Sequence, residues 1–177
     1  SPTTAGAALG SGIAPSKIGD VVGVTKAYLT RVGSGPFPTE LEDEVGEMIR
    51  DKGQEFGTTT GRPRRCGWLD LVMLELSHRI CGFTSLAITK LDILSDMDEI
   101  KVCVGYKGED GSEINHFPSS LSYLAKCSPV YKNFSGWSSS DIDISKGIIP
   151  NKMKIYLDFI SEKLNIPISI VSLGPGR

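Results

Sequence analysis

The chain has 177 residues, of which 40% are hydrophobic and 23% are charged, and its formal net charge at pH 7 is −2. This composition predicts a globular protein with one substantial core. The near-neutral charge gives no general attraction for nucleic acid or an anionic membrane surface. No apolar run approaches the length of a membrane-spanning helix, and no signal peptide is recognisable, so we expect neither nucleic acid nor membrane as a partner.

The cysteines are widely spaced and include no C-x-x-C pair; they are Cys66, Cys81, Cys103 and Cys127. Such spacing is typical of free thiols in a reducing compartment, rather than of a disulfide framework or a zinc site. We therefore expect a cytoplasmic protein.

The first half of the chain predicts three helices. Apolar spacing favours a helix over residues 18–28, followed by a turn over 33–38 that is rich in glycine and proline. Thr39 is a candidate N-cap for a second helix that ends near Gly53. A third helix is expected over residues 68–80, where leucine, valine and isoleucine recur at helical spacing.

The second half predicts short strands and one long helix. Apolar or alternating runs indicate strands at residues 85–88, 99–107 and 166–171, and a further short strand within 128–137. An amphipathic helix is expected from Pro150 through Leu164, because proline is favoured in the first turn of a helix. No internal repeat or linker divides the chain, so we expect one α/β unit.

The segment 57–66, GTTTGRPRRC, carries the clearest chemical signal. Glycines allow a ligand to approach the backbone closely, and threonine hydroxyls both donate and accept hydrogen bonds. Arginine binds carboxylates and phosphates through two parallel hydrogen bonds. The segment therefore predicts a site for an anionic small molecule, although a solvated basic loop is the alternative.

Four segments together resemble the adenylosuccinate synthetase family. They are GTTTGRPRRCGWLD at 57–70, RVGSGPFPTEL at 31–41, TKLD at 89–92 and SLGP at 172–175. The resemblance covers essentially the whole chain in the family's order. It implies an α/β fold, namely the C-terminal part of a P-loop-like mixed-sheet synthetase in which helices flank a central sheet. Residues 1–177 are then part of a single domain.

The resemblance also implies what this chain does not supply. Family members carry a phosphate-binding glycine loop, the catalytic acid and base, and the Mg²⁺ ligands in a region before these motifs. No G-x-x-x-x-G-K-[ST] motif occurs in the sequence. We therefore expect the C-terminal portion of the enzyme, with no catalytic residue and no metal ligand of its own and no synthetase activity in isolation.

The family's reaction ligates IMP and L-aspartate at the expense of GTP. The segment 57–66, which we call the substrate loop, carries most of the implied contacts. Four loop residues match positions that cradle aspartate: Thr58, Thr59, Thr60 and Gly61. Arg62 matches the arginine that bridges aspartate and the IMP ribose. Arg64, in the same loop, matches one that contacts a GTP phosphate and is also expected among the aspartate contacts. Val32 matches a position against the IMP ribose, with simple packing as the alternative. Arg65 matches a basic position to which we assign no ligand.

The guanine site is implied at the two strand ends 89–92 and 171–175. Asp92 can accept both the N1–H and the N2–H of guanine, while the stem of Lys90 packs along the purine. Leu91 belongs to the same turn. The second strand end is expected to contact the base through its backbone and hydroxyl groups, with Ser172, Leu173 and Gly174. Outside this context, both segments would be ordinary turns.

Two other functions are weighed against the enzyme. A non-catalytic guanine-nucleotide-binding module would use the same two strand ends, and the sequence preceding these motifs in the gene would distinguish it from a synthetase. A signalling GTPase is disfavoured, because such proteins resemble this chain only in the Lys-x-Asp turn. Relatives of the family form homodimers, so the complete protein is expected to dimerise.

Overall fold

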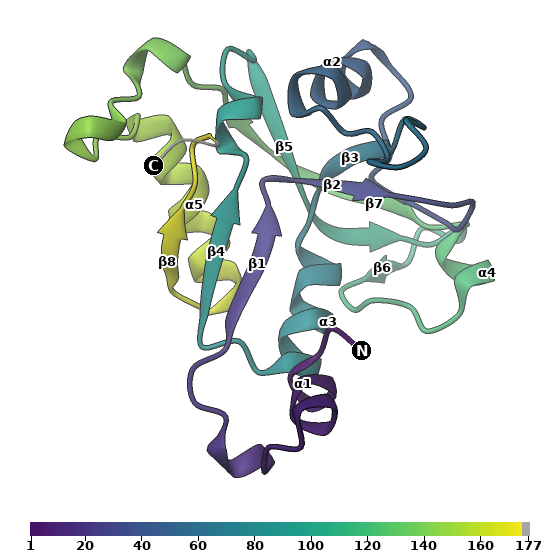
Figure 1. The fold of residues 1–177 in the computed structure, drawn as a ribbon. Coiled ribbons are helices and arrows are strands. Elements are labelled where there is room, and N and C mark those ends of the chain that lie inside the picture. Colours follow the sequence, from purple (N-terminus) through teal and green to yellow (C-terminus); the bar gives the residue numbers. More distant parts are fainter. Residues whose placement is uncertain (175–177) are drawn as a thin grey trace.

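The structure of the chain is a computed structural model, which describes residues 1–174 (Figure 1). The helices are α1 (Thr4–Ser11), α2 (Glu44–Gly53), α3 (Leu71–Cys81), α4 (Leu121–Leu124) and α5 (Asn151–Leu164). The strands are β1 (Val22–Lys26), β2 (Tyr28–Arg31), β3 (Arg65–Asp70), β4 (Ser85–Thr89), β5 (Glu99–Lys107), β6 (Glu113–Ile114), β7 (Ser128–Ser135) and β8 (Ile168–Val171). Short 3₁₀ turns complete this description: η1 (Pro15–Lys17), η2 (Leu91–Leu94), η3 (Ser139–Asp141) and η4 (Ile144–Lys146). None of the described helices is long and apolar enough to cross a membrane.

The strands form two sheets. The first is parallel, in the order β1-β4-β8, and the second is mixed, in the order β2-β3-β5-β6 with β7 paired to β5. In the first sheet Val22 pairs with Ser85 and Lys26 with Thr89, so these two strands begin and end together. Figure 1 shows the arrowheads of β1, β4 and β8 pointing the same way. Their carboxyl ends therefore share one edge of the sheet.

One hydrophobic core joins the two sheets and the helices that flank them. Its fully buried members include Tyr28, Ile49, Leu86, Ile100 and Tyr156. The α5 helix contributes one face to this core, and the hydroxyl of Tyr156 donates to the carbonyl of Ala27 at 3.0 Å. A smaller cluster lies between α3, β5 and α4. The predicted α/β class with helices flanking the sheet is confirmed, with the strands divided between two sheets.

Several predicted elements are confirmed. The strand expected at 99–107 is β5, and the strands expected at 85–88 and 166–171 correspond to β4 and β8. The amphipathic helix is α5, for which Pro150 is the N-cap residue and Asn165 adopts the left-handed conformation at the C-terminus. These segments had unambiguous periodicity and clear end signals.

The helix predicted over 18–28 is wrong, because this segment forms β1 and the start of β2. Val22, Val24 and Thr25 of β1 are β-branched, and β-branched side chains favour extended backbone. Packing also explains the glycine at position 23, because a Cβ atom there would lie 2.7 Å from the ring of Phe83. Parallel pairing with β4 thus outweighs the helical spacing of the apolar residues.

The other two predicted helices begin later than expected. Residues 68–70 belong to β3, and the carboxylate of Asp70 caps α3 by accepting from the amides of Val72 at 3.0 Å and Met73 at 3.2 Å. The second helix is capped by Asp43 rather than Thr39, which is fully buried and whose carbonyl accepts from Trp68. A fully buried strand followed directly by a helix presents one continuous apolar run, so periodicity alone cannot separate them.

Candidate functional site

The predicted guanine turn, residues 89–92, lies at the shared carboxyl edge of the parallel sheet. Lys90 follows β4, and Ser172 follows β8, with its amide donating to the carbonyl of Ile88 at 2.9 Å. The two predicted strand ends are therefore neighbours in the fold. In open α/β sheets, ligands bind in the crevice outside the carboxyl ends of the strands.

Asp92 presents an unused acceptor at this edge. It lies in η2, and its Oδ1 is buried without a hydrogen-bond partner among residues 1–174. A buried carboxylate oxygen without a partner is costly, so the oxygen is suited to donors from a ligand. The side chain of Leu91 is fully buried in the core, which leaves only its backbone for such a contact.

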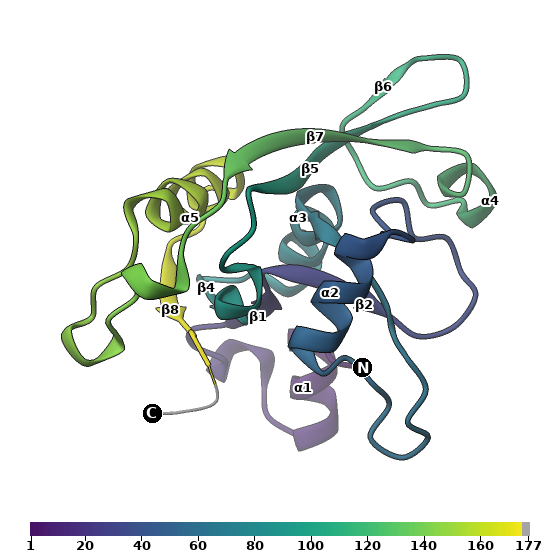
Figure 2. The same ribbon diagram turned by 90° about the horizontal axis from the view of Figure 1, so that it is seen from above.

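The substrate loop between α2 and β3 is a hairpin that Figure 2 shows extending beyond the end of α2. Phe56 and Pro63 form a bridge at its base, and the amide of Gly57 donates to the carbonyl of Arg62 at 2.9 Å. Gly61 has φ +64°, the left-handed conformation that favours glycine. At the tip, four side chains are exposed to solvent: Thr58, Thr59, Thr60 and Arg62.

The three arginines of the loop have different surroundings. No hydrogen bond or ion pair holds the Arg62 side chain within the part of the chain that the structure describes. The Nη1 of Arg64 donates to Oε2 of Glu55 at 2.8 Å. Arg65 instead forms a bidentate pair with Glu40, with one contact at 2.6 Å, so it is engaged within the fold.

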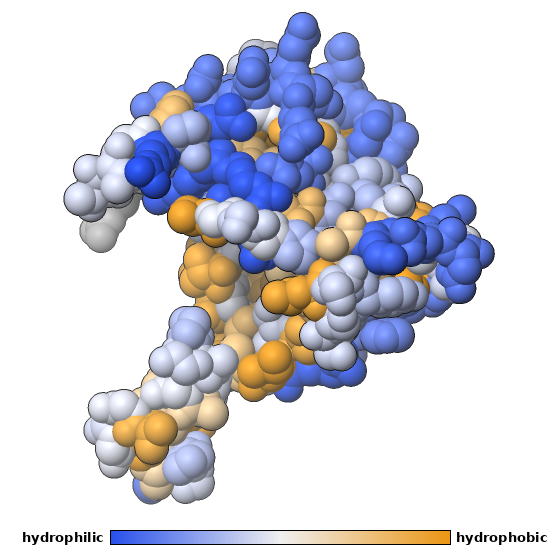
Figure 3. All heavy atoms as spheres, turned by 90° about the vertical axis from the view of Figure 1, so that its right-hand side faces the viewer, coloured by the Kyte–Doolittle hydropathy of each residue, from blue (hydrophilic) through white to orange (hydrophobic). Residues whose placement is uncertain are grey.

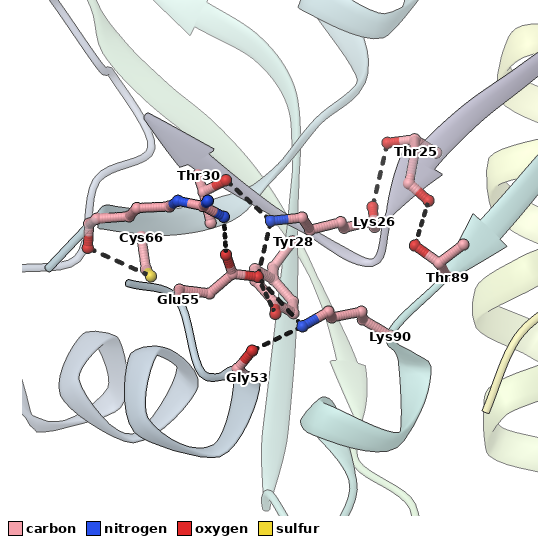
Figure 4. Close-up of polar contacts among 10 residues, drawn as sticks. Thr25, Lys26, Tyr28, Thr30, Gly53, Glu55, Cys66, Thr89 and Lys90 are labelled. Carbon is pink, nitrogen blue, oxygen red and sulfur yellow. Dashed lines mark hydrogen bonds and ion pairs between the residues drawn. The ribbon is translucent and has the colours of Figure 1, made fainter. Parts of the chain in front are cut away.

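Glu55 is a polar centre that the sequence analysis missed (Figure 4). Its side chain is 2% exposed, and its Oε1 accepts from Nζ of Lys26 and from the hydroxyl of Tyr28, each at 2.7 Å. Burial alone would raise the pKa of Glu55, but hydrogen bonds from Lys26 and Tyr28 and the charge of Lys26 lower that pKa to about 2. The carboxylate is therefore ionised. No motif marks a lone glutamate between two glycines, so the sequence carried no signal for it.

Glu55 joins the two predicted ligand regions. Nζ of Lys90, from the guanine turn, lies 3.6 Å from Oε1 of Glu55 and donates to the carbonyl of Gly53 at 2.6 Å. Arg64, from the substrate loop, pairs with the other carboxylate oxygen. The structure thus brings together a phosphate-binding candidate and a base-binding candidate around one buried acid.

The comparisons with known proteins identify the family of the chain. The sequence model of the adenylosuccinate synthetase family matches residues 1–177. The chain belongs to the adenylosuccinate synthetase family.

Individual relatives extend the match over the whole chain. The chain is 54% identical over 178 residues to the adenylosuccinate synthetase of Clostridium novyi (strain NT), with 100% of the chain and 42% of that protein covered. It is 51% identical over 177 residues to that of Caldanaerobacter subterraneus subsp. tengcongensis, with 99% and 41% covered. The solved structure of fully ligated adenylosuccinate synthetase from Plasmodium falciparum is similar with a TM-score of 0.91 and 42% identity, covering 98% of this chain and 42% of that one. The chain therefore spans about two fifths of the length of the synthetases it matches.

The turn that carries Val32 adjoins the substrate loop of this synthetase chain. Val32 itself is 80% exposed, which does not fit the packing alternative. Nη1 of Arg65 donates to the carbonyls of Gly33 and Gly35, each at 2.8 Å. Arg65 therefore holds the turn after Val32 against β3, which gives a structural role to the arginine for which the sequence offered none.

The remaining predicted residues are placed as follows. The hydroxyl of Ser172 lies 3.5 Å from the carbonyl of Gly174, and Leu173 packs against the main core. Pro175, the last residue of the SLGP motif, lies outside the described residues. Among residues 1–174, no group of three His, Cys, Asp or Glu side chains is placed to hold a metal ion.

A separate apolar hollow of about 650 Å³ lies at the other end of the parallel sheet. It is lined by the N-terminal segment, by the start of β1 and by Phe83. Figure 3 shows the N-terminal segment standing out from the body beside hydrophobic atoms, whereas the upper part of this face is hydrophilic. The hollow shares no residue with the predicted substrate contacts.

Proposed function

We propose that the complete protein ligates IMP and L-aspartate to adenylosuccinate at the expense of GTP. In this reaction the 6-oxygen of IMP takes the terminal phosphoryl group of GTP. The aspartate amine then attacks C6 of the purine, and phosphate leaves from that carbon together with the 6-oxygen. This chain covers 41% of the length of the Caldanaerobacter relative, so it cannot by itself carry the whole reaction into the proposal. For the whole protein, the proposal therefore rests on family membership. The observation in this chain that supports it most is the buried Oδ1 of Asp92, which has no hydrogen-bond partner among residues 1–174 and lies in the turn that follows Lys90.

Within this reaction, the chain binds and orients substrates. Asp92 accepts the two donors of guanine, and Arg64 contacts a GTP phosphate from the far side of the Glu55 cluster. The loop tip receives aspartate, with its carboxylate on Arg62, and Val32 lies against the IMP ribose. Partly desolvated arginines at a phosphoryl group stabilise the charge that develops during transfer.

Mg²⁺ is part of the proposed reaction, but the described residues do not form a site that fits it. We therefore assign no step to the metal within this part of the chain. A homodimer and a cytoplasmic location are likewise proposals that rest on the family resemblance and on the spacing of the cysteines. Light scattering on the complete protein tests the first of these.

The experiment is to replace Asp92 with asparagine in the complete protein. An amide accepts from one donor and offers a donor of its own, so Asp92→Asn should prefer xanthine over guanine nucleotides. The loss of a hydrogen bond to a charged group costs about 1.5–3 kcal/mol, so the KM for GTP should rise roughly 10- to 150-fold, with a gain for XTP. Asp98→Asn, an exposed carboxylate in the next loop, is the matched control. Unchanged GTP affinity in Asp92→Asn, with no gain for XTP, would remove Asp92 from the site.

The second candidate is a non-catalytic guanine-nucleotide-binding module. The same Asp92 geometry supports it, because base recognition does not require chemistry. The complete protein separates the two functions: GTP binding without any adenylosuccinate formation from IMP and aspartate would favour the module.

A further inference from the structure

Four side chains from separate parts of the chain converge on the carboxylate of Glu55. Lys26 comes from the end of β1, Tyr28 from β2, Arg64 from the substrate loop and Lys90 from the turn after β4. Figure 4 shows the labelled lysines and the tyrosine directed toward this acid. No other described carboxylate joins so many segments, and none of its partners is a near neighbour in sequence.

The backbone around Glu55 is built to allow this convergence. A Cβ atom on Gly53 would lie 2.4 Å from the hydroxyl of Tyr28, so only glycine lets the tyrosine reach the acid. The carbonyl of Glu55 accepts from the amide of Arg64 at 2.9 Å, which fixes the base of the substrate loop to the same residue. Glu55 therefore holds Arg64 through both its main chain and its side chain.

The charges of the cluster leave an excess for an anion. Three cations and one carboxylate give a net charge of +2. The acid is 2% exposed, whereas the side chains of Arg64 and Lys90 are 32% and 39% exposed. Arg64 and Lys90 thus keep N–H donors accessible to solvent, while the carboxylate that they pair with is buried. Arg64 gives Glu55 one N–H, and an arginine has five.

We infer that Glu55 is a positioning residue for the nucleotide, which holds Arg64 and Lys90 in a fixed arrangement so that one GTP molecule reaches both. The inference rests on the proposed function, in which Arg64 contacts the phosphates and Lys90 lies beside the base. Without the carboxylate, the three positive charges would repel one another in a partly desolvated space. Arg64 and Lys90 would then no longer be held by the same residue. Glu55 itself does not touch the substrate.

The test is Glu55→Gln in the complete protein, with the KM measured for each substrate in turn. Glutamine keeps the shape but removes the charge that attracts the cations. The KM for GTP should rise about 10- to 100-fold, the range expected for one charge-assisted hydrogen bond, and the KM for IMP should stay within about twofold. In a double-mutant cycle with Arg64→Gln, the two effects on GTP should be strongly non-additive.

The matched control is Glu40→Gln, which breaks another carboxylate–arginine pair next to the same loop. Because that pair holds the turn at Val32, its effect should fall on IMP rather than on GTP. If Glu55→Gln does not fold, Glu55→Asp keeps the buried charge while it shortens the reach to Arg64. It should still raise the KM for GTP at least about fivefold.

Two results would overturn the inference. One is an equal rise in the KM for all three substrates, which would indicate a general loss of structure. The other is an unchanged KM for GTP, in Glu55→Gln or in a folded Glu55→Asp. A wild-type protein without synthetase activity would instead refute the proposed function, and GTP titration by calorimetry would then still test Glu55.

Discussion

Replacing Arg65 should loosen the turn that carries Val32 while leaving the guanine site intact. The Arg65 guanidinium makes a bidentate pair with Glu40 and donates to two carbonyls of the turn. Its side chain is 30% exposed and that of Glu40 is 19% exposed, so each contact should contribute at the low end of its range. We estimate that Arg65→Ala costs about 2–4 kcal/mol of local stability, a factor of roughly 30 to 1,000 in the opening equilibrium.

Hydrogen exchange with mass spectrometry measures this opening directly. Amides of residues 33–40, including that of Glu40, which donates to the carbonyl of Phe37 at 3.0 Å, should exchange faster by that factor. In the complete protein, the KM for IMP should rise, and the KM for GTP should change little. Arg79→Ala, an exposed arginine on α3, is the control and should change neither. The reasoning is refuted if exchange in 33–40 is unchanged, or if β5 accelerates equally.

Two further predictions concern Arg62 and the acidity of Glu55. Arg62→Leu removes an exposed guanidinium that is unpaired among residues 1–174, so the KM for aspartate should rise about 100-fold with little change for GTP. A defect confined to GTP would reverse the roles of Arg62 and Arg64. The pKa of Glu55 lies at about 2, below its ordinary 4.5, so its ionisation stabilises the fold above pH 4.5 and this contribution is lost as the pH falls through about 2. The difference in unfolding free energy between wild type and Glu55→Gln, measured with urea, should therefore shrink by about 3 kcal/mol between pH 6 and pH 2, and a difference that is independent of pH would contradict it.

Much of the fold could be predicted where pattern and end signals agreed. The strand at 99–107 alternates cleanly and is β5, and Pro150 opened the expected helix α5. The family resemblance also placed the turn at Lys90 and the turn at Ser172 in one region, and in the structure the amide of Ser172 donates to the carbonyl of Ile88, at the end of β4.

The failures have two physical causes. In 68–70, burial on both faces of β3 removed the alternation by which a strand is recognised. In 18–28 the apolar side chains of Val22 and Val24 lie on the exposed face of β1, so the apolar pattern of the sequence does not follow the buried face of the strand. Glu55 could not be identified from the sequence, because its role as a shared ion-pair partner depends on Lys26, Arg64 and Lys90. Only the tertiary structure brings these three residues together. The residues of a buried ion cluster of this kind follow no characteristic spacing along the sequence.

The most direct test of the central claim is a crystal structure of the complete protein with GDP and aspartate. The account predicts guanine at the carboxyl edge of β4 and β8, with its N1–H and N2–H on Asp92, and the phosphates directed toward Arg64. The aspartate carboxylate should lie on Arg62 at the tip of the substrate loop. A guanine base bound elsewhere, with the Asp92 carboxylate still unpartnered, would contradict the account.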